Sequence, residues 1–178
     1  LEILVNNSLE QNTLSWLKNV KELQREKTYL NSRFDFCGID ENNQEFILEV
    51  KNVPLADYVD MLDKDKKKLD LSGYEFNNKI AYFPDGYRKK VKDTVSPRAL
   101  KHIQELQEIK KERNIRTILC FVIQRDDASS FQPSNIDPIY KNAVTEAYYD
   151  GVEIKAIQAK WELDGSINLI NDNVMINI

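Results

Sequence analysis

The chain of 178 residues contains only two cysteines, five glycines and one histidine. Two cysteines are too few for a disulfide scaffold, and Cys37 and Cys120 lie in apolar stretches without metal-type spacing, so we expect two buried thiols. The few glycines form no phosphate-cradling loop of the NTPase type, and no nucleophile-elbow motif is present. These absences argue against disulfide-stabilised proteins, NTP hydrolases and serine hydrolases.

Long apolar runs are also missing. The longest, residues 117–123, is far shorter than the roughly 20 residues that a membrane helix requires, and it suits a buried strand. No secretory signal is visible, and the low cysteine content favours a reducing compartment, so we expect a soluble intracellular protein. The first residue is leucine rather than methionine, which indicates a fragment of a longer protein.

The net charge of -4 argues against a protein that coats nucleic acid through bulk charge. The basic residues are nevertheless clustered. The first cluster alternates with aspartates, which favours a solvated, salt-bridged surface: Lys64, Lys66, Lys67 and Lys68. The second suits contact with a nucleic-acid backbone as well as it suits a solvated surface: Tyr87, Arg88, Lys89, Lys90, Lys92, Arg98 and Lys101.

Helices are predicted where start signals precede apolar residues at helical spacing. Their positions are residues 8–24, a segment from Ser96-Pro97 onward, and a segment from Asp137-Pro138 to Gly151. Strands are predicted from β-branched and aromatic runs bounded by turn residues. Their positions are residues 25–30, 33–37, 45–51, 116–124, 152–161 and 167–170.

The order of these elements predicts an α/β fold (α+β, with a mixed sheet) that has helices on both faces of the sheet. We expect one domain over residues 1–178. Turn residues 40–44 join two strands into a hairpin, and Asp164-Gly165 joins the last two. Residues 57–78 have too few apolar side chains for a core and are expected to form a mobile excursion.

The first hairpin brings one acid from each arm together. With the turn centred near Asn42, Asp35 lies opposite Glu49, where Cβ atoms are about 4.5–5.5 Å apart. Lys51 follows on the same face as Glu49 because strand side chains alternate. Phe34 and Phe36 are expected together on the opposite face from Asp35. A different loop register would move Asp35 by one pair or to the other face.

Two carboxylates about 5 Å apart repel by about 3 kcal/mol at an effective dielectric constant of about 20. Lys51 offsets part of this energy, and a divalent cation offsets more. Mg²⁺ fits best, with Mn²⁺ as a substitute, because Mg²⁺ accepts few protein ligands and keeps waters for chemistry. We therefore expect Asp35 and Glu49 to bind metal, and Lys51 to hold or deprotonate water or to stabilise a pentacovalent phosphorus. A bare Glu-x-Lys is usually an exposed charge pair, so the prediction depends on Asp35.

Several longer sequence segments resemble those of a known protein family. They are residues 31–36 (NSRFDF), 46–53 (FILEVKNV), 82–85 (YFPD), 98–106 (RALKHIQEL), 118–122, 130–133 (SFQP), 136–140 and 151–154 (GVEI). In this combination and order, the chain resembles the sugar fermentation stimulation protein A (SfsA) family, which is similar to the PD-(D/E)XK nucleases. The resemblance implies a restriction-endonuclease-like core, weakly sequence-specific nuclease activity and non-specific DNA binding. It maps the family aspartate, glutamate and lysine onto Asp35, Glu49 and Lys51.

The resemblance implies three further features of the chain. A family glutamate ahead of these strands corresponds to Glu26, although Leu30 replaces the glycine usual after the tyrosine. Residues 53–80 are longer than in typical members and form an extended insertion. The family's N-terminal OB-like domain is expected to be absent from this chain.

The sequence thus predicts a magnesium-dependent nuclease for DNA, RNA or both; the alternative is a non-catalytic DNA-binding regulatory protein. Asp85 is expected in a turn, with a metal-site role as the alternative. His102 is expected to be exposed or to contact phosphate. The predicted nucleic-acid contacts are Arg33, Arg88, Lys89, Lys90, Arg98, Lys101 and His102.

Overall fold

The computed structural model describes residues 1–86 and 88–178, so Tyr87 of the second basic cluster lies outside the described residues. The helices are α1 (Glu2–Glu10), α2 (Asp63–Lys66), α3 (Pro97–Arg113) and α4 (Pro138–Tyr149). The strands are β1 (Glu22–Tyr29), β2 (Ser32–Ile39), β3 (Glu45–Val53), β4 (Ala56–Asp57), β5 (Lys79–Phe83), β6 (Arg116–Ile123), β7 (Ala128–Pro133), β8 (Glu153–Trp161), β9 (Ile167–Asn171) and β10 (Met175–Ile176).

The larger sheet has the strand order β1-β2-β3-β6-β8-β9. Its centre is parallel, since β6 pairs in parallel with both β3 and β8, and its outer strands are antiparallel. Residues 117–123 of β6 are all buried, as expected for a strand covered on both faces. The chain therefore places β3, which carries two of the three predicted site residues, next to the most buried strand.

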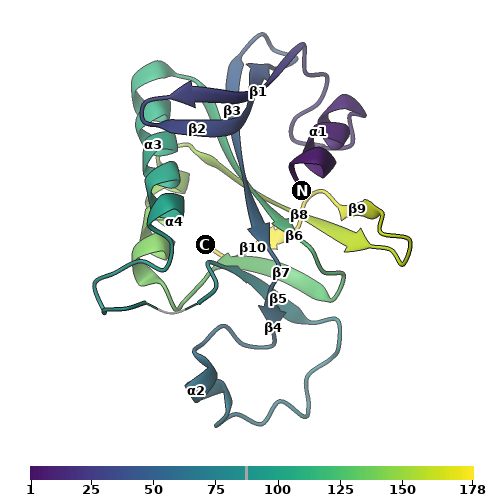
Figure 1. Ribbon diagram of the computed structural model, residues 1–178, viewed down its shortest axis with the longest axis vertical. Coiled ribbons are helices and arrows are strands. Elements are labelled where there is room, and N and C mark those ends of the chain that lie inside the picture. Colours follow the sequence, from purple (N-terminus) through teal and green to yellow (C-terminus); the bar gives the residue numbers. More distant parts are fainter. Residues whose placement is uncertain (87) are drawn as a thin grey trace.

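Two hydrophobic cores lie on opposite faces of this sheet. Figure 1 shows α3 and α4 side by side against one face, whereas α1 covers part of the other. The smaller sheet, with the order β10-β7-β5-β4, shares the core of α3 and α4. The predicted fold class, a mixed sheet with helices on both faces, is confirmed.

The start signals of α3 and α4 act as predicted. The Ser96 side chain accepts a hydrogen bond from the backbone of Ala99 (3.3 Å), and Asp137 accepts one from Tyr140 (3.1 Å). The two cysteine thiols are buried and free. None of the helices in the described part of the chain has the length and apolar character needed to span a membrane.

The predicted helix over residues 8–24 is wrong. The helix lies earlier, at Glu2–Glu10, and the chain then turns through Asn12 and Asn19, which have positive φ angles of 57° and 50°. Leu14 and Leu17, whose spacing suggested a helical stripe, are buried but lie in an irregular segment. Their spacing indicated burial and not helical structure.

The sequence prediction also missed the smaller sheet, because β5 and β7 are short and mix polar with apolar residues. Residues 57–78, expected to be mobile, carry β4 and α2 and are anchored at Asp60. This buried carboxylate accepts hydrogen bonds from the Ser134 hydroxyl, the Gln132 amide and the Asn135 backbone, each at 2.7 Å. The excursion is therefore anchored to the end of β7 and to the residues that follow it.

Substitution Asp60→Ala is expected to loosen this excursion, because it leaves three donors without their acceptor. We expect the free energy of unfolding to fall by about 1–3 kcal/mol and protease cleavage within residues 57–78 to accelerate. Urea unfolding and limited proteolysis measure the two effects. Asp70→Ala, at an exposed position of the same excursion, is the control and should change little. Equal cleavage rates in Asp60→Ala and the wild type would contradict the anchor.

Candidate metal centre

The hairpin has the predicted register. Pairs run from Ile39 with Glu45 to Phe36 with Leu48, so the turn centres near Asn42. Asp35 lies on β2 one residue before this paired stretch. Its Oδ2 accepts a hydrogen bond from the backbone N–H of Val50 at 2.7 Å. The aspartate is thereby held against the backbone of β3 beside Glu49.

The expected alternation of side chains along β2 is broken at this point. Phe34 belongs to the core under α3, whereas Phe36 belongs to the core under α1. The β1–β2 pairing skips Glu26 and Asp35, between the pairs Arg25–Phe36 and Lys27–Phe34, and Glu26 has a φ angle of +57°. The prediction that Phe34 and Phe36 share a face is therefore wrong, and Asp35 lies between two residues that face opposite ways.

Glu49 is a buried carboxylate, with 3% of its surface exposed. Its Oε1 accepts from Lys51 Nζ and from His102 Nδ1, each at 2.5 Å, and Lys51 Nζ lies 3.1 Å from His102 Nδ1. Burial acts to raise the pKa of Glu49, but the hydrogen bond from His102 and the charge and hydrogen bond of Lys51 outweigh it, so the pKa is lowered. Glu49 is therefore ionised at neutral pH.

The second oxygen of Glu49 has a different environment. Oε2 is buried and has no hydrogen-bond partner among the described residues. A buried anionic oxygen without a donor is costly, and a cation or ordered water commonly satisfies it. Within residues 1–86 and 88–178, no cluster of three or more His, Cys, Asp or Glu side chains is arranged to bind metal. A cation at Oε2 would therefore have two carboxylates and waters as ligands, which fits Mg²⁺.

Asp35 is the second of these carboxylates. Burial and then the charge of Glu49 raise the pKa of Asp35 from its ordinary value of 3.8 to about 6, against the opposing hydrogen bond from Val50 and the charge of Lys51. The negative charge of Glu2, at the start of α1, also raises it. The two acids thus interact electrostatically, and a divalent cation between them would relieve their repulsion.

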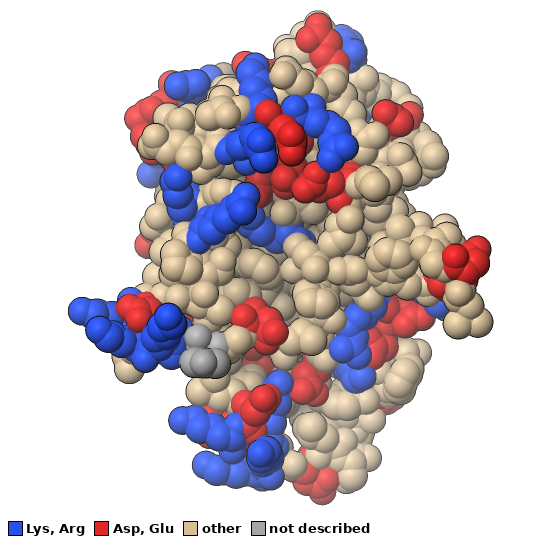
Figure 2. All heavy atoms as spheres, viewed as in Figure 1, with Lys and Arg blue, Asp and Glu red and all other residues tan. Residues whose placement is uncertain are grey.

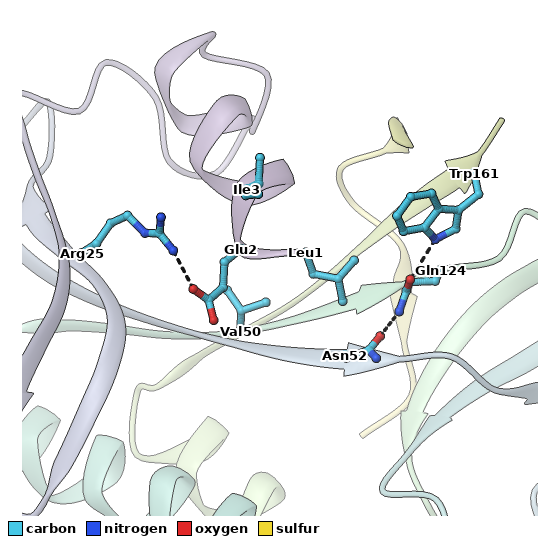
Figure 3. Close-up of a pocket in the computed structure, with 8 residues that line it drawn as sticks. All are labelled: Leu1, Glu2, Ile3, Arg25, Val50, Asn52, Gln124 and Trp161. Atoms are coloured by element: carbon cyan, nitrogen blue, oxygen red, sulfur yellow. Dashed lines mark hydrogen bonds and ion pairs between the residues drawn. The ribbon is translucent and has the colours of Figure 1, made fainter. Parts of the chain in front are cut away.

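A groove of about 630 Å³ lies on the α1 side of β3 (Figure 3), and its described lining includes Val50 but not Asp35, Glu49 or Lys51. Val50, whose N–H binds Asp35, is part of its lining. Arg25 and Glu2 form an ion pair of 2.7 Å on one side, and the half-exposed Trp161 stands on the other. Solvent and small ligands can therefore approach β3 from the α1 side, next to the Asp35 backbone contact.

The secondary site candidates lie elsewhere. Glu26 is exposed and pairs with Arg33 at 3.8 Å. Asp85 is exposed, stands before Gly86 with its positive φ angle of 121°, and lines a different cavity with Tyr82. The structure does not bring either acid to Glu49, and Asp85 lies in irregular chain between bends at Pro84 and Gly86.

Basic residues lie in several separate groups on the face seen in Figure 2. Figure 2 shows Lys and Arg side chains above α3 and the β1–β2 hairpin, over the loop before α3, and over α2, with acids among them. Arg33, Arg98 and Lys101 are exposed, and Lys101 Nζ donates to the Asn31 carbonyl at 2.8 Å. The remaining predicted contacts, Arg88, Lys89 and Lys90, lie in the loop before α3.

His102 was expected to be exposed, and this expectation is wrong. It is 4% exposed and contacts Glu49 and Lys51. The signal was present in the sequence, since His102 is three residues after Ala99 and four before Leu106, both on the buried stripe of α3. Glu2 was also missed, because the misplaced first helix left α1 out of the prediction.

Comparison with known proteins identifies the family. The family model described as the sugar fermentation stimulation protein RE domain matches residues 2–165. The chain belongs to this family. A sugar fermentation stimulation protein homolog of Clostridium perfringens (strain SM101) is 33% identical over 171 residues, which cover 96% of this chain and 59% of that protein. A homolog of Methanosphaera stadtmanae is 29% identical, covering 97% of this chain and 64% of that protein.

The fold is also that of a solved family member. The structure of Pyrococcus furiosus SfsA in complex with Ca²⁺ superimposes with a TM-score of 0.74 and 23% identity, over 98% of this chain and 62% of that chain. The present chain therefore spans about 60% of the length of its relatives.

The raised pKa of Asp35 makes a stability prediction for metal-free protein. The folded state holds a proton that the unfolded chain releases, so this contribution to stability is complete below pH 3.8 and is lost as pH rises through about 6. Asp35→Asn removes that loss. We expect the melting temperature of Asp35→Asn relative to wild type to rise by a few degrees between pH 4 and pH 7, measured by thermal unfolding in EDTA. A difference that is constant with pH would contradict the raised pKa of Asp35.

Proposed function

We propose that this chain is a metal-dependent nuclease that hydrolyses phosphodiester bonds of DNA, RNA or both with little sequence specificity. One observation carries the proposal. One oxygen of the buried, ionised Glu49 accepts from Lys51 and His102, whereas the other has no donor in residues 1–86 and 88–178 and lies beside a second acid, Asp35. This asymmetry suits a cation site next to a lysine.

Asp35 and Glu49 are the proposed ligands of Mg²⁺, for which Mn²⁺ would substitute. The solved relative from Pyrococcus furiosus is described in complex with Ca²⁺, a hard cation that, like Mg²⁺, takes oxygen ligands. When bound, such a cation supplies a Lewis acid for a phosphate oxygen and an activated water. The protein's own contribution is to hold both carboxylates in place, Asp35 through the Val50 backbone and Glu49 through its partners on Oε1.

Lys51 is the proposed third member of the site. Its side chain is 13% exposed, so its ammonium group is partly shielded from solvent and its charge is weakly screened. At Oε1 of Glu49 it is placed to orient an attacking water or to stabilise negative charge that develops on the phosphoryl group. Either role requires a lysine amine next to the metal ligands. Neither role requires a nucleophile from the protein, because water attacks the phosphorus.

The surface supports contact with the nucleic-acid backbone through local charge. With a net charge of -4, the chain does not attract nucleic acid as a whole, so the exposed basic residues near the centre must supply the contacts. Arg33 lies on β2, and Arg98 and Lys101 lie on α3, where Lys101 contacts the β1–β2 turn at Asn31; Arg88, Lys89 and Lys90 form a separate basic group in the loop before α3. Contacts of this kind read phosphate and not base identity, which fits weak sequence preference.

Removing each site residue separates the proposed roles. Lys51→Ala is expected to reduce the rate of cleavage by about 10²- to 10⁴-fold while Mn²⁺ binding persists. Asp35→Asn and Glu49→Gln are expected to lose both cleavage and Mn²⁺ binding. Labelled single and double strands incubated with Mg²⁺, Mn²⁺ or EDTA report cleavage, and calorimetry reports metal binding.

Lys160→Ala is the matched control, since Lys160 forms an exposed ion pair with Asp126. It should cleave at the wild-type rate. Salt-sensitive binding of nucleic acid without cleavage under any metal would contradict the proposed nuclease activity. It would favour the alternative, a non-catalytic DNA-binding protein. Cleavage that is unchanged in EDTA would refute the metal site.

A further inference from the structure

His102 reaches the proposed centre from a different element. It projects from α3, and its Nδ1 lies 2.5 Å from Glu49 Oε1 and 3.1 Å from Lys51 Nζ. We propose that His102 is a positioning residue, which fixes the Glu49 carboxylate so that Oε1 is occupied and Oε2 is presented to the cation. This inference rests on the proposed function and assigns a role to the chain's sole histidine.

The chemistry of the contact determines which nitrogen carries hydrogen. Oε1 already accepts from the Lys51 ammonium at 2.5 Å, as expected of a carboxylate oxygen, so Nδ1 at 2.5 Å from the same oxygen must donate. Nδ1 then has no lone pair for Lys51, and both side chains donate to the same oxygen. The distance of 3.1 Å between Lys51 and His102 is therefore a consequence of their shared acceptor and not a hydrogen bond.

The surroundings hold the imidazole in this orientation. His102 is 4% exposed, and its ring centroid lies 5.8 Å from that of Phe34, on the strand that carries Asp35. Ala99, Ile103 and Leu106 of the same helix are buried in the core beside it. The ring is thus packed between α3 and β2, and a rotation of Glu49 would break its hydrogen bond to this buried ring.

This arrangement makes the two carboxylate oxygens of Glu49 different from each other. Two donors satisfy Oε1, and Oε2 remains without one among the described residues. Lys51 alone could not define that choice, because its flexible chain can follow either oxygen, whereas the buried ring cannot. Hydrogen-bond partners of metal ligands typically change metal affinity or activity by about 10- to 100-fold when they are removed.

The tautomer of His102 tests the hold on Glu49 without metal or substrate. With a single histidine, the chain labelled with ¹⁵N-histidine gives one set of imidazole signals. In metal-free protein near pH 8, we expect Nδ1 to carry hydrogen, and we expect Glu49→Gln to shift the ring toward the Nε2–H form that predominates in water. An Nδ1 without hydrogen in the wild type overturns the proposal, whether or not the protein is a nuclease.

Substitutions test the consequence for the cation. The amide nitrogen of asparagine reproduces the position of Nδ1, whereas glutamine extends too far. We expect His102→Asn to bind Mn²⁺ within a few-fold of wild type, and His102→Gln and His102→Leu to bind about 10- to 100-fold more weakly. Calorimetry measures affinity, and thermal unfolding identifies any variant that fails to fold. Gln104→Leu, at an exposed position of α3, is the control and should bind as wild type.

The outcomes distinguish this proposal from the function on which it rests. Equal Mn²⁺ affinities for wild type, His102→Asn and His102→Gln contradict a positioning role, and the two amide variants decide the matter if His102→Leu does not fold. A wild-type protein that binds no Mn²⁺ contradicts the proposed nuclease, and the tautomer alone then decides whether His102 holds Glu49.

Discussion

The structure depends on the burial of one ionised carboxylate. Glu49 lies on β3, in the middle of the larger sheet, where an uncompensated charge would cost several kcal/mol. Lys51 from the same strand and His102 from α3 compensate one oxygen, so the packing of α3 on the sheet and the geometry of the site are a single constraint. Oε2 has no hydrogen-bond donor in the part of the chain that the structure describes, so the charge of Glu49 is compensated there on one oxygen alone.

The two acids of the centre are unequal for physical reasons. Hydrogen bonds from His102 and Lys51 outweigh burial and keep the pKa of Glu49 low. Burial and then the repulsion of Glu49 raise the pKa of Asp35 to about 6, against its one backbone donor from Val50. Near neutral pH, Glu49 is therefore ionised, whereas the charge of Asp35 depends on the pH. A cation that joins them would stabilise the ionised form of Asp35, so metal binding and proton release are linked.

Local chemistry made much of the fold predictable. The turn at residues 40–44 set the register that places Asp35 beside Glu49, and the caps at Ser96 and Asp137 set the starts of α3 and α4. Prediction failed where tertiary contacts override local pattern. Leu14 and Leu17 are buried without a helix, and the short strands of the smaller sheet are stabilised by pairing between distant segments. Phe34 and Phe36 face opposite cores because β2 is irregular at Asp35, and His102 was misread although helical spacing placed it on the buried stripe.

Anomalous scattering from crystals soaked in Mn²⁺ tests the central claim most directly, because it locates the ion without reference to activity. The account predicts one strong peak bound by Glu49 Oε2 and an Asp35 oxygen at about 2.0–2.6 Å, the range spanned by Mg²⁺ and Ca²⁺ ligands, with Lys51 and His102 still on Oε1. A peak bound elsewhere, or Oε2 hydrogen-bonded to a protein donor with no ion nearby, would contradict it.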